Sequence, residues 1–263
     1  MQMKVTVCQL RDDPAELESD WAGLVAHVRA EESNLVLLPE MPFSPWFATS
    51  RRFDPKVWAA AVAAHTAWEA RLRDLAPAVV IASRPIDFGN ERYNEGFVWD
   101  AETGIRGVHA KTFLPNEEGV WEASWYQRAT PEFTPVQVFD AQVGFLICTE
   151  LWYFEQARLY GLEGVHLLVT PRLTGGSTLD KWLVGGRAAA IAAGAFGLSS
   201  NRFDKSGAYG GQGWVVGPDG ELLGLTSASD PFVSVRVDLE AAKKAKSTYP
   251  RYAISGSFPL TQH

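Results

Sequence analysis

One run of six residues restricts the fold of this chain more than any other feature. Residues 35–40 read LVLLPE, an apolar run that ends on a proline and a charge. Such a run is typical of a β-strand buried on both faces, which occurs where helices cover both sides of a sheet. The surrounding sequence agrees, because short apolar or β-branched runs alternate with segments of helical period. Strands are expected at 4–10, 35–40, 78–86, 93–104, 143–150, 165–171 and 197–203, and helices at 14–33, 57–76, 153–164 and 178–196.

The C-terminal part of the chain adds antiparallel pieces to this alternation. Residues 213–227 predict a hairpin around the turn sequence PDG, and residues 232–246 predict a strand followed by a helix. An α/β fold follows, with a pair of mixed sheets covered by helices, in one domain that spans residues 1–263. From about residue 247 the sequence has no period, and this tail is expected to lie on the surface or on a neighbouring subunit.

Composition and charge exclude several classes of protein. No apolar run approaches the roughly 20 residues that span a bilayer. The N-terminus, MQMKVTVCQLRDD, becomes charged before a signal-peptide core can form, so a cytoplasmic protein is expected. A formal net charge of -7 without a block of Lys or Arg argues against nucleic-acid binding. Two cysteines make no disulfide framework, so reduced thiols are expected, with Cys8 as a small core residue.

The sequence also gives no sign of a metal or cofactor. The five histidines have no metal-ligand spacing, and His109 is interpreted as structural. The glycine-rich segment GGQGWVVG does not match G-x-G-x-x-G and opens a strand rather than a helix. We therefore expect a site built only from protein side chains.

Three reactive residues stand at the ends of apolar strands. Glu40 ends LVLLPE, Lys111 ends IRGVHAK, and Cys148 nearly ends VGFLIC. A buried carboxylate or ammonium costs several kcal/mol unless it is paired, so mutual pairing is expected if the three strands are neighbours. This set suffices for acyl transfer, with Cys148 as nucleophile, Glu40 as general base and Lys111 as oxyanion stabiliser. The backbone N–H of Thr149 is a candidate second oxyanion donor.

The same three segments resemble the nitrilase superfamily of carbon–nitrogen hydrolases. The chain offers LLPEMPFSPW, HAKTFLPNEEGVWEASWY and GFLICTELWYFE in the order of the family's Glu–Lys–Cys motifs. The resemblance covers nearly the whole chain. It implies a four-layer αββα sandwich with two mixed sheets, an acyl thioester, no metal, and a homodimer or larger homo-oligomer. Many members carry a second glutamate before a pair of aromatics, a position that Glu122 of EASWY matches, and its implied role is to hold the lysine or the leaving amine.

The residues after the cysteine leave the substrate open. Amidase-type members often read Cys-x-Asp and nitrile-hydrolysing members Cys-Trp-Glu, whereas this chain reads Cys-Thr-Glu, with Glu150 in the acidic position. The favoured hypothesis is an amidase that cleaves a small non-peptide amide. The alternatives are a nitrilase, an N-carbamoyl amide hydrolase, and a catalytically silent scaffold or binding protein of the same fold.

Several further residues are candidates for substrate binding. Aromatic side chains that follow or flank the motifs predict a narrow apolar pocket for a small or aromatic acyl group. These residues are Trp46, Trp121, Trp125 and Trp152. Glu150, two positions after Cys148, is a further candidate for substrate binding. Arg172, at the strand end in VTPRLT, has two interpretations: it clamps a substrate carboxylate, or it pairs with Glu150 as part of the scaffold.

Overall fold

The computed structural model describes residues 1–11 and 13–253. It contains two β-sheets, and the first of them is mixed. The strand order is β12-β1-β2-β3-β4-β5, in which β1, β2 and β3 are parallel and the other pairs antiparallel. The strands are β1 (Gln2–Arg11), β2 (Leu35–Leu37), β3 (Val79–Phe88), β4 (Glu91–Asp100), β5 (Gly104–Ala110) and β12 (Phe232–Asp238).

The second sheet continues from the end of β1. Residues Gln9–Arg11 leave the first sheet and pair in parallel with β9, which in turn is parallel to β8, as β8 is to β7. Antiparallel pairs β7–β6, β9–β10 and β10–β11 complete it. Its strands are β6 (Val136–Val138), β7 (Ala141–Phe145), β8 (Leu167–Arg172), β9 (Phe196–Phe203), β10 (Trp214–Val216) and β11 (Leu222–Leu225). Because β1 contributes to both sheets, the strands form one hydrogen-bonded network, in which β10, β11 and β12 branch from the path β5-β4-β3-β2-β1-β9-β8-β7-β6.

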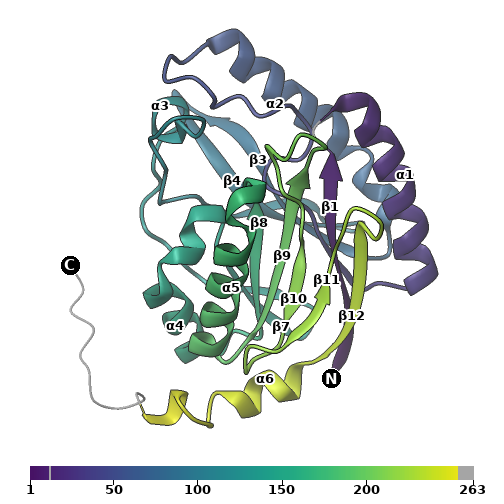
Figure 1. Ribbon diagram of the computed structural model, residues 1–263, viewed down its shortest axis with the longest axis vertical. Helices are drawn as coiled ribbons and strands as arrows, with labels where there is room; N and C mark the ends of the chain where they lie inside the picture. The colour runs from purple at the N-terminus through teal and green to yellow at the C-terminus, as the bar shows by residue number, and fades with distance from the viewer. Residues whose placement is uncertain (12, 254–263) are drawn as a thin grey trace.

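Helices cover the outer face of each sheet, as Figure 1 shows. The first sheet is covered by α1 (Pro14–Glu31), α2 (Pro55–Glu69) and the short 3₁₀ helix η1 (Leu72–Leu75), and the second by α4 (Phe154–Leu162) and α5 (Leu179–Ala193). Pro14 opens α1, whose N-cap Asp13 accepts hydrogen bonds from the N–H groups of Ala15 and Glu16. The remaining helices are α3 (Glu122–Trp125), α6 (Leu239–Ala245) and the 3₁₀ helices η2 (Cys148–Trp152), η3 (Gly176–Thr178) and η4 (Arg251–Ala253).

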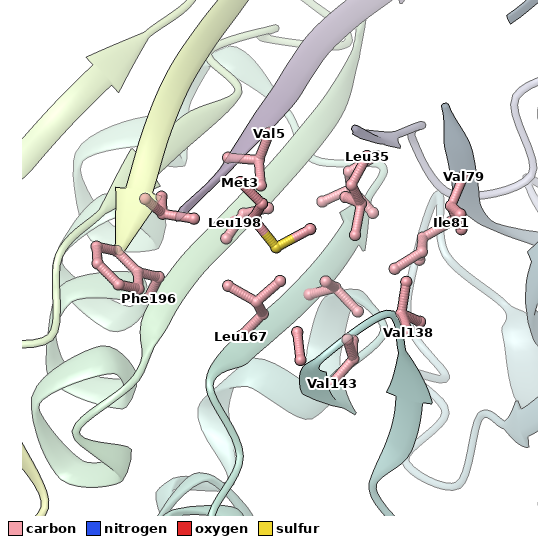
Figure 2. Packing of buried hydrophobic residues seen from close by; sticks show 14 of the residues in the cluster. Met3, Val5, Leu35, Val79, Ile81, Val138, Val143, Leu167, Phe196 and Leu198 are labelled. Carbon is pink, nitrogen blue, oxygen red and sulfur yellow. The ribbon is translucent and has the colours of Figure 1, made fainter. Parts of the chain in front are cut away.

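The largest core lies between the two sheets. Figure 2 shows Val5 and Leu35 of the first sheet and Leu167 and Leu198 of the second in this one cluster. Alternation along β1 explains how one strand serves two cores, since Val5 and Val7 point between the sheets while Cys8 and Leu10 point toward α1. The layers are therefore helix, sheet, sheet and helix, which confirms the expected αββα sandwich.

The structure differs from the sequence-based expectations in a few places. The helix expected at 57–76 is divided into α2 and η1, and α3 and β6 were not predicted. Within the expected tail, Arg251 is buried and donates to the carbonyls of Ala245, Ile191 and Pro218, so this residue anchors the segment 247–253 to its own chain. Residues 254–263 of the tail lie outside the described residues.

Candidate active site

The three reactive residues follow strands that run in the same direction. β2 and β7 are linked through parallel pairs with β1, β9 and β8, and β5 regains the direction of β2 through two antiparallel pairs. The three strands are not neighbours, because β3 and β4 separate β5 from β2, and β7 belongs to the other sheet. Glu40, Lys111 and Cys148 come together because the carboxyl ends of both sheets lie at one edge of the sandwich.

Lys111 lies between two carboxylates in the interior. Its Nζ is 2.8 Å from Oε1 of Glu40 and 2.7 Å from Oε2 of Glu122, and all three side chains are at most 2% exposed. Burial alone would lower the pKa of Lys111, but the charges of Glu122 and Glu40 outweigh it and raise the pKa above its ordinary value. Lys111 is therefore a permanent cation at the floor of the site.

Glu40 uses only one of its two carboxylate oxygens for this pairing. Oε1 accepts hydrogen bonds from Lys111 Nζ and from Nδ2 of Asn94, at 2.8 and 2.7 Å. Oε2 is buried and has no hydrogen-bond partner within residues 1–11 and 13–253. A buried oxygen without a partner is costly in a scaffold and is expected where a proton is to be accepted.

Cys148 begins η2 at a sharp turn that follows β7. Its φ of +49° lies in the left-handed region, which a residue with a side chain adopts at a cost of about 1–3 kcal/mol. The residue is 5% exposed, and its Sγ donates a hydrogen bond to the carbonyl of Leu173 at 3.7 Å. Burial, and then the charge of Glu40, raise the pKa of the thiol, while Lys111 acts in the opposite direction. The resting thiol is thus protonated and needs a base in order to react.

The carboxyl group of Glu122 has a raised pKa. It lies in α3, beside the buried Tyr126. Burial raises the pKa of Glu122 to about 7, and Glu40 adds to this effect while Lys111 opposes it.

Replacement of Glu122 by Gln should change how stability depends on pH. Because the folded-state pKa of about 7 exceeds the unfolded value of 4.5, wild-type stability is complete below pH 4.5 and declines as pH rises toward 7. We expect the free energy of unfolding to fall by about 3 kcal/mol across this range relative to Glu122→Gln. Denaturant unfolding at pH 4.5 to 7.5 measures it, and parallel curves for the two proteins would contradict the assignment.

Glu150 joins the cysteine segment to the lysine segment. Its Oε1 accepts from the N–H of Thr112 at 2.7 Å, and its Oε2 accepts from the N–H of Ile147 and from Nε2 of His109, both at 2.8 Å. The side chain is fully buried and both oxygens are occupied. The expectation that Glu150 binds substrate is therefore corrected: it holds the neighbours of Lys111 and Cys148 together.

Replacement of Glu150 by Gln should cost stability rather than chemistry. The amide NH₂ group would face a backbone N–H in place of an acceptor, so one buried donor loses its partner. We expect a loss of about 1–3 kcal/mol in the free energy of unfolding. Denaturant unfolding measures it, and an unchanged midpoint together with normal folding would count against the scaffold role.

Three of the four candidate tryptophans lie in one cluster beside the site. Trp46 and Trp125 are buried and Trp121 partly buried in an aromatic cluster that also contains Leu173, whose carbonyl contacts Cys148. Trp152 lies elsewhere, because it packs against Trp182 of α5 and is 38% exposed. Trp152 is therefore removed from the set of candidate pocket residues. A cleft of about 740 Å³ is lined by Trp46 and Trp125 but not by the three reactive residues.

Arg172 ends β8 and does not pair with Glu150. The guanidinium donates to Oγ of Ser199, Oγ1 of Thr174 and the carbonyl of Gln212, each at 2.7 Å, and is fully buried. Arg172 therefore belongs to the scaffold, which was one of the two interpretations. Its partners, however, are neutral groups and not the carboxylate of Glu150. A substrate carboxylate cannot reach it without displacing these partners.

Three further residues that hold the site were not predicted from the sequence. Asn94 donates to Glu40 from β4, and Tyr126 lies beside Glu122. Arg202 donates to the carbonyls of Glu40 and Ser44 and so fixes the turn after β2. Of the three, only Arg202 stands near the end of a strand, which is the signal that pointed to Glu40, Lys111 and Cys148.

The part of the chain that the structure describes contains no group of three or more His, Cys, Asp or Glu side chains placed to bind a metal ion. Within the same residues, every helix is too short or too polar to cross a membrane.

Comparisons with known proteins agree with this geometry. The profile of the carbon-nitrogen hydrolase family matches residues 4–247. An N-carbamoylputrescine amidase of Arabidopsis thaliana is 24% identical over 250 residues, which cover 86% of this chain and 82% of the relative. A crystal structure of a carbon-nitrogen hydrolase from Helicobacter pylori G27 superimposes with a TM-score of 0.83 at 23% identity, covering 97% of this chain and 95% of that one.

A second solved structure shares the fold. It is a variant of the amidase from Nesterenkonia sp. AN1 that carries the acetamide moiety of fluoroacetamide on its active-site cysteine. It superimposes with a TM-score of 0.72 at 19% identity, covering 93% of this chain and 92% of that one. Because the family profile matches nearly the whole sequence, the chain belongs to the carbon-nitrogen hydrolase family.

Proposed function

We propose that this hydrolase cleaves a small non-peptide amide through an acyl thioester on Cys148. One observation carries the proposal: Oε2 of Glu40 is a buried acceptor without a hydrogen-bond partner among the described residues, in the same cluster as a protonated thiol. The other oxygen of Glu40 is fixed by Lys111 and Asn94, so the free oxygen has a defined orientation. A carboxylate held in this way suits a general base.

The first half of the reaction forms the thioester. Glu40 takes the proton of the Cys148 thiol as Sγ bonds to the carbonyl carbon, and the carbonyl oxygen becomes negative. Lys111 and the backbone N–H of Thr149 donate to this oxygen. Thr149 lies in the first turn of η2, where a backbone N–H has no acceptor within its own helix. Glu40 then passes the proton to the nitrogen, and the C–N bond breaks with release of the amine or ammonia.

The second half restores the enzyme. Glu40 takes a proton from water, whose oxygen bonds to the thioester carbon, and the same two donors stabilise the second oxyanion. When the C–S bond breaks, the proton returns to the sulfur and the carboxylic acid leaves. Glu122 holds Lys111 in place throughout, since both of its oxygens lie within 2.9 Å of Nζ.

The relatives support this chemistry and favour a second candidate substrate. The Nesterenkonia amidase bonds covalently to the acetamide moiety of fluoroacetamide through its active-site cysteine, so the cysteine of that protein is a nucleophile, the role that the proposal gives to Cys148. The similarity to an N-carbamoylputrescine amidase favours N-carbamoyl amines, in which the carbonyl carbon lies between two nitrogens. Nitriles have less support, because Thr149 follows Cys148 where nitrile-hydrolysing members often have tryptophan.

A panel of substrates tests the proposal. The protein is incubated with simple aliphatic and aromatic amides, N-carbamoyl amines and nitriles, while ammonia release and intact mass are followed. We expect turnover of at least one amide or N-carbamoyl amine, and an acyl adduct that Cys148→Ala lacks. Absence of both turnover and adduct across the panel would favour the catalytically silent scaffold.

A further inference from the structure

Arg172 is a buried cation that contacts no anion. Its three hydrogen-bond acceptors are two hydroxyl groups and one backbone carbonyl, all neutral. Its guanidinium also lies 3.9 Å from the ring centroid of Trp214 and 5.8 Å from that of Trp182. Within residues 1–11 and 13–253, no carboxylate forms an ion pair with it. A buried charge normally has an ionic partner, so this arrangement requires an explanation.

The backbone beside Arg172 contacts both reacting groups of the site. The carbonyl of Arg172 accepts from the N–H of Glu40 at 3.2 Å, and the next carbonyl, that of Leu173, accepts from Cys148 Sγ. The guanidinium donates to Oγ1 of Thr174 and so links the two ends of the segment 172–174. Arg172 is therefore close to the nucleophile but separated from it by its own backbone.

The other charges around the thiol come from three segments. Glu40 follows β2, Lys111 follows β5 and Glu122 lies in α3, and Lys111 is paired with both carboxylates. Glu150, on the same helix as Cys148, is paired with His109. The positive charge of Lys111 is thus largely offset by its two partners, whereas that of Arg172 is not offset by any carboxylate.

We propose that Arg172 is a positioning residue whose uncompensated charge favours the thiolate of Cys148 and whose hydrogen bonds fix the carbonyl that orients it. The inference rests on the proposed role of Cys148 as nucleophile. Burial lowers the pKa of Arg172 to about 9 and the nearby Cys148 opposes this shift, as expected for a cation with an anion forming beside it. Only a negative charge on the sulfur would then give the guanidinium an ionic partner.

The first test measures the reactivity of the thiol without any substrate turnover. Alkylation by iodoacetamide is followed by intact mass between pH 5 and 10 in the wild type, Arg172→Met and Arg172→Lys, with Cys148→Ala giving the background from Cys8. We expect Arg172→Met to react about tenfold more slowly than the wild type throughout the pH range in which the thiol is mainly protonated. Arg172→Lys keeps the charge but not the planar fork, and its alkylation rate should stay near the wild-type value.

A second pair of variants keeps the arginine and decides the question if Arg172→Met does not fold. Thr174→Asp places a carboxylate beside Nη1, which now lies 2.7 Å from Oγ1, and neutralises the guanidinium. Thr174→Asn has nearly the same shape and no charge. We expect about tenfold slower alkylation in Thr174→Asp and little change in Thr174→Asn.

The outcomes separate this inference from the proposed function. Equal alkylation rates in Thr174→Asp and Thr174→Asn, or equal decreases in rate in Arg172→Met and Arg172→Lys, would overturn the electrostatic role. A decrease in rate confined to the variants that remove or neutralise the charge would support it, whatever the substrate panel shows. Lack of turnover in the wild type alongside such a decrease would reject the hydrolase mechanism but not the effect of Arg172 on the thiol.

Discussion

Cys148→Ala is expected to lower kcat by about 10⁴- to 10⁶-fold, because the other site residues cannot form the covalent bond that divides the reaction into two steps. The variant should fold, since alanine removes one atom that is 3.7 Å from its hydrogen-bond acceptor and leaves the pairing of Lys111 intact. Ammonia release and intact mass, measured on any substrate that the wild type turns over, test both statements. The acyl adduct should be absent.

The second cysteine provides the matched control for this variant. Cys8 is fully buried in β1, and its Sγ donates to the carbonyl of Leu37 rather than to a residue of the site. Cys8→Ala should keep wild-type kcat and lose about 1 kcal/mol in the free energy of unfolding, from the small cavity and the lost contact. Turnover that survives in Cys148→Ala, or that disappears only in Cys8→Ala, would require a different nucleophile.

The three residues of the candidate site could be predicted from the sequence because their signal is local. An apolar strand that ends on a carboxylate, an ammonium or a thiol is readable without knowledge of the partners, and Glu40, Lys111 and Cys148 all carry it. The sandwich itself was predicted by two local signals, wholly apolar runs and their alternation with helical periods. The strand neighbours were not, since pairing between β1 and β9 depends on contacts almost 200 residues apart.

The residues that the sequence missed or misassigned depend on such distant contacts. Asn94 reaches Glu40 only because β4 passes between β3 and β5, a position that no local pattern specifies. Glu150 looks like a site acid in sequence, but its acceptors are filled by Thr112, 38 positions away, and by its own turn. Trp152 follows Cys148 closely, yet the helical turn of η2 directs it toward α5. Proximity in sequence was a poor guide wherever a turn intervened.

Lys111→Met should be the most destabilising single substitution in the site. It leaves Glu40 and Glu122 buried side by side without a cation, which typically costs about 3–5 kcal/mol. The loss should grow as pH rises, because Glu122 is protonated at pH 5 and ionises near pH 7 in the wild type. Turnover should also fall by at least about 10²-fold with the loss of an oxyanion donor. Denaturant unfolding at pH 5 and pH 8 measures the first effect.

Two further variants show whether this cost comes from the uncompensated carboxylates. Lys205 is 74% exposed and forms a surface ion pair with Glu16. Lys205→Met breaks this pair and should lower the free energy of unfolding by at most about 1 kcal/mol at either pH. Lys111→Met combined with Glu122→Gln removes the cation and one of its two carboxylates, so it should be more stable at pH 8 than Lys111→Met alone. Turnover should remain lost, because the missing donor is not replaced. The double variant could instead be less stable than the wild type by the sum of the losses measured for Lys111→Met and for Glu122→Gln. In that case Lys111 does not relieve repulsion between buried carboxylates. Its stabilising effect would then have to come from the packing of its side chain.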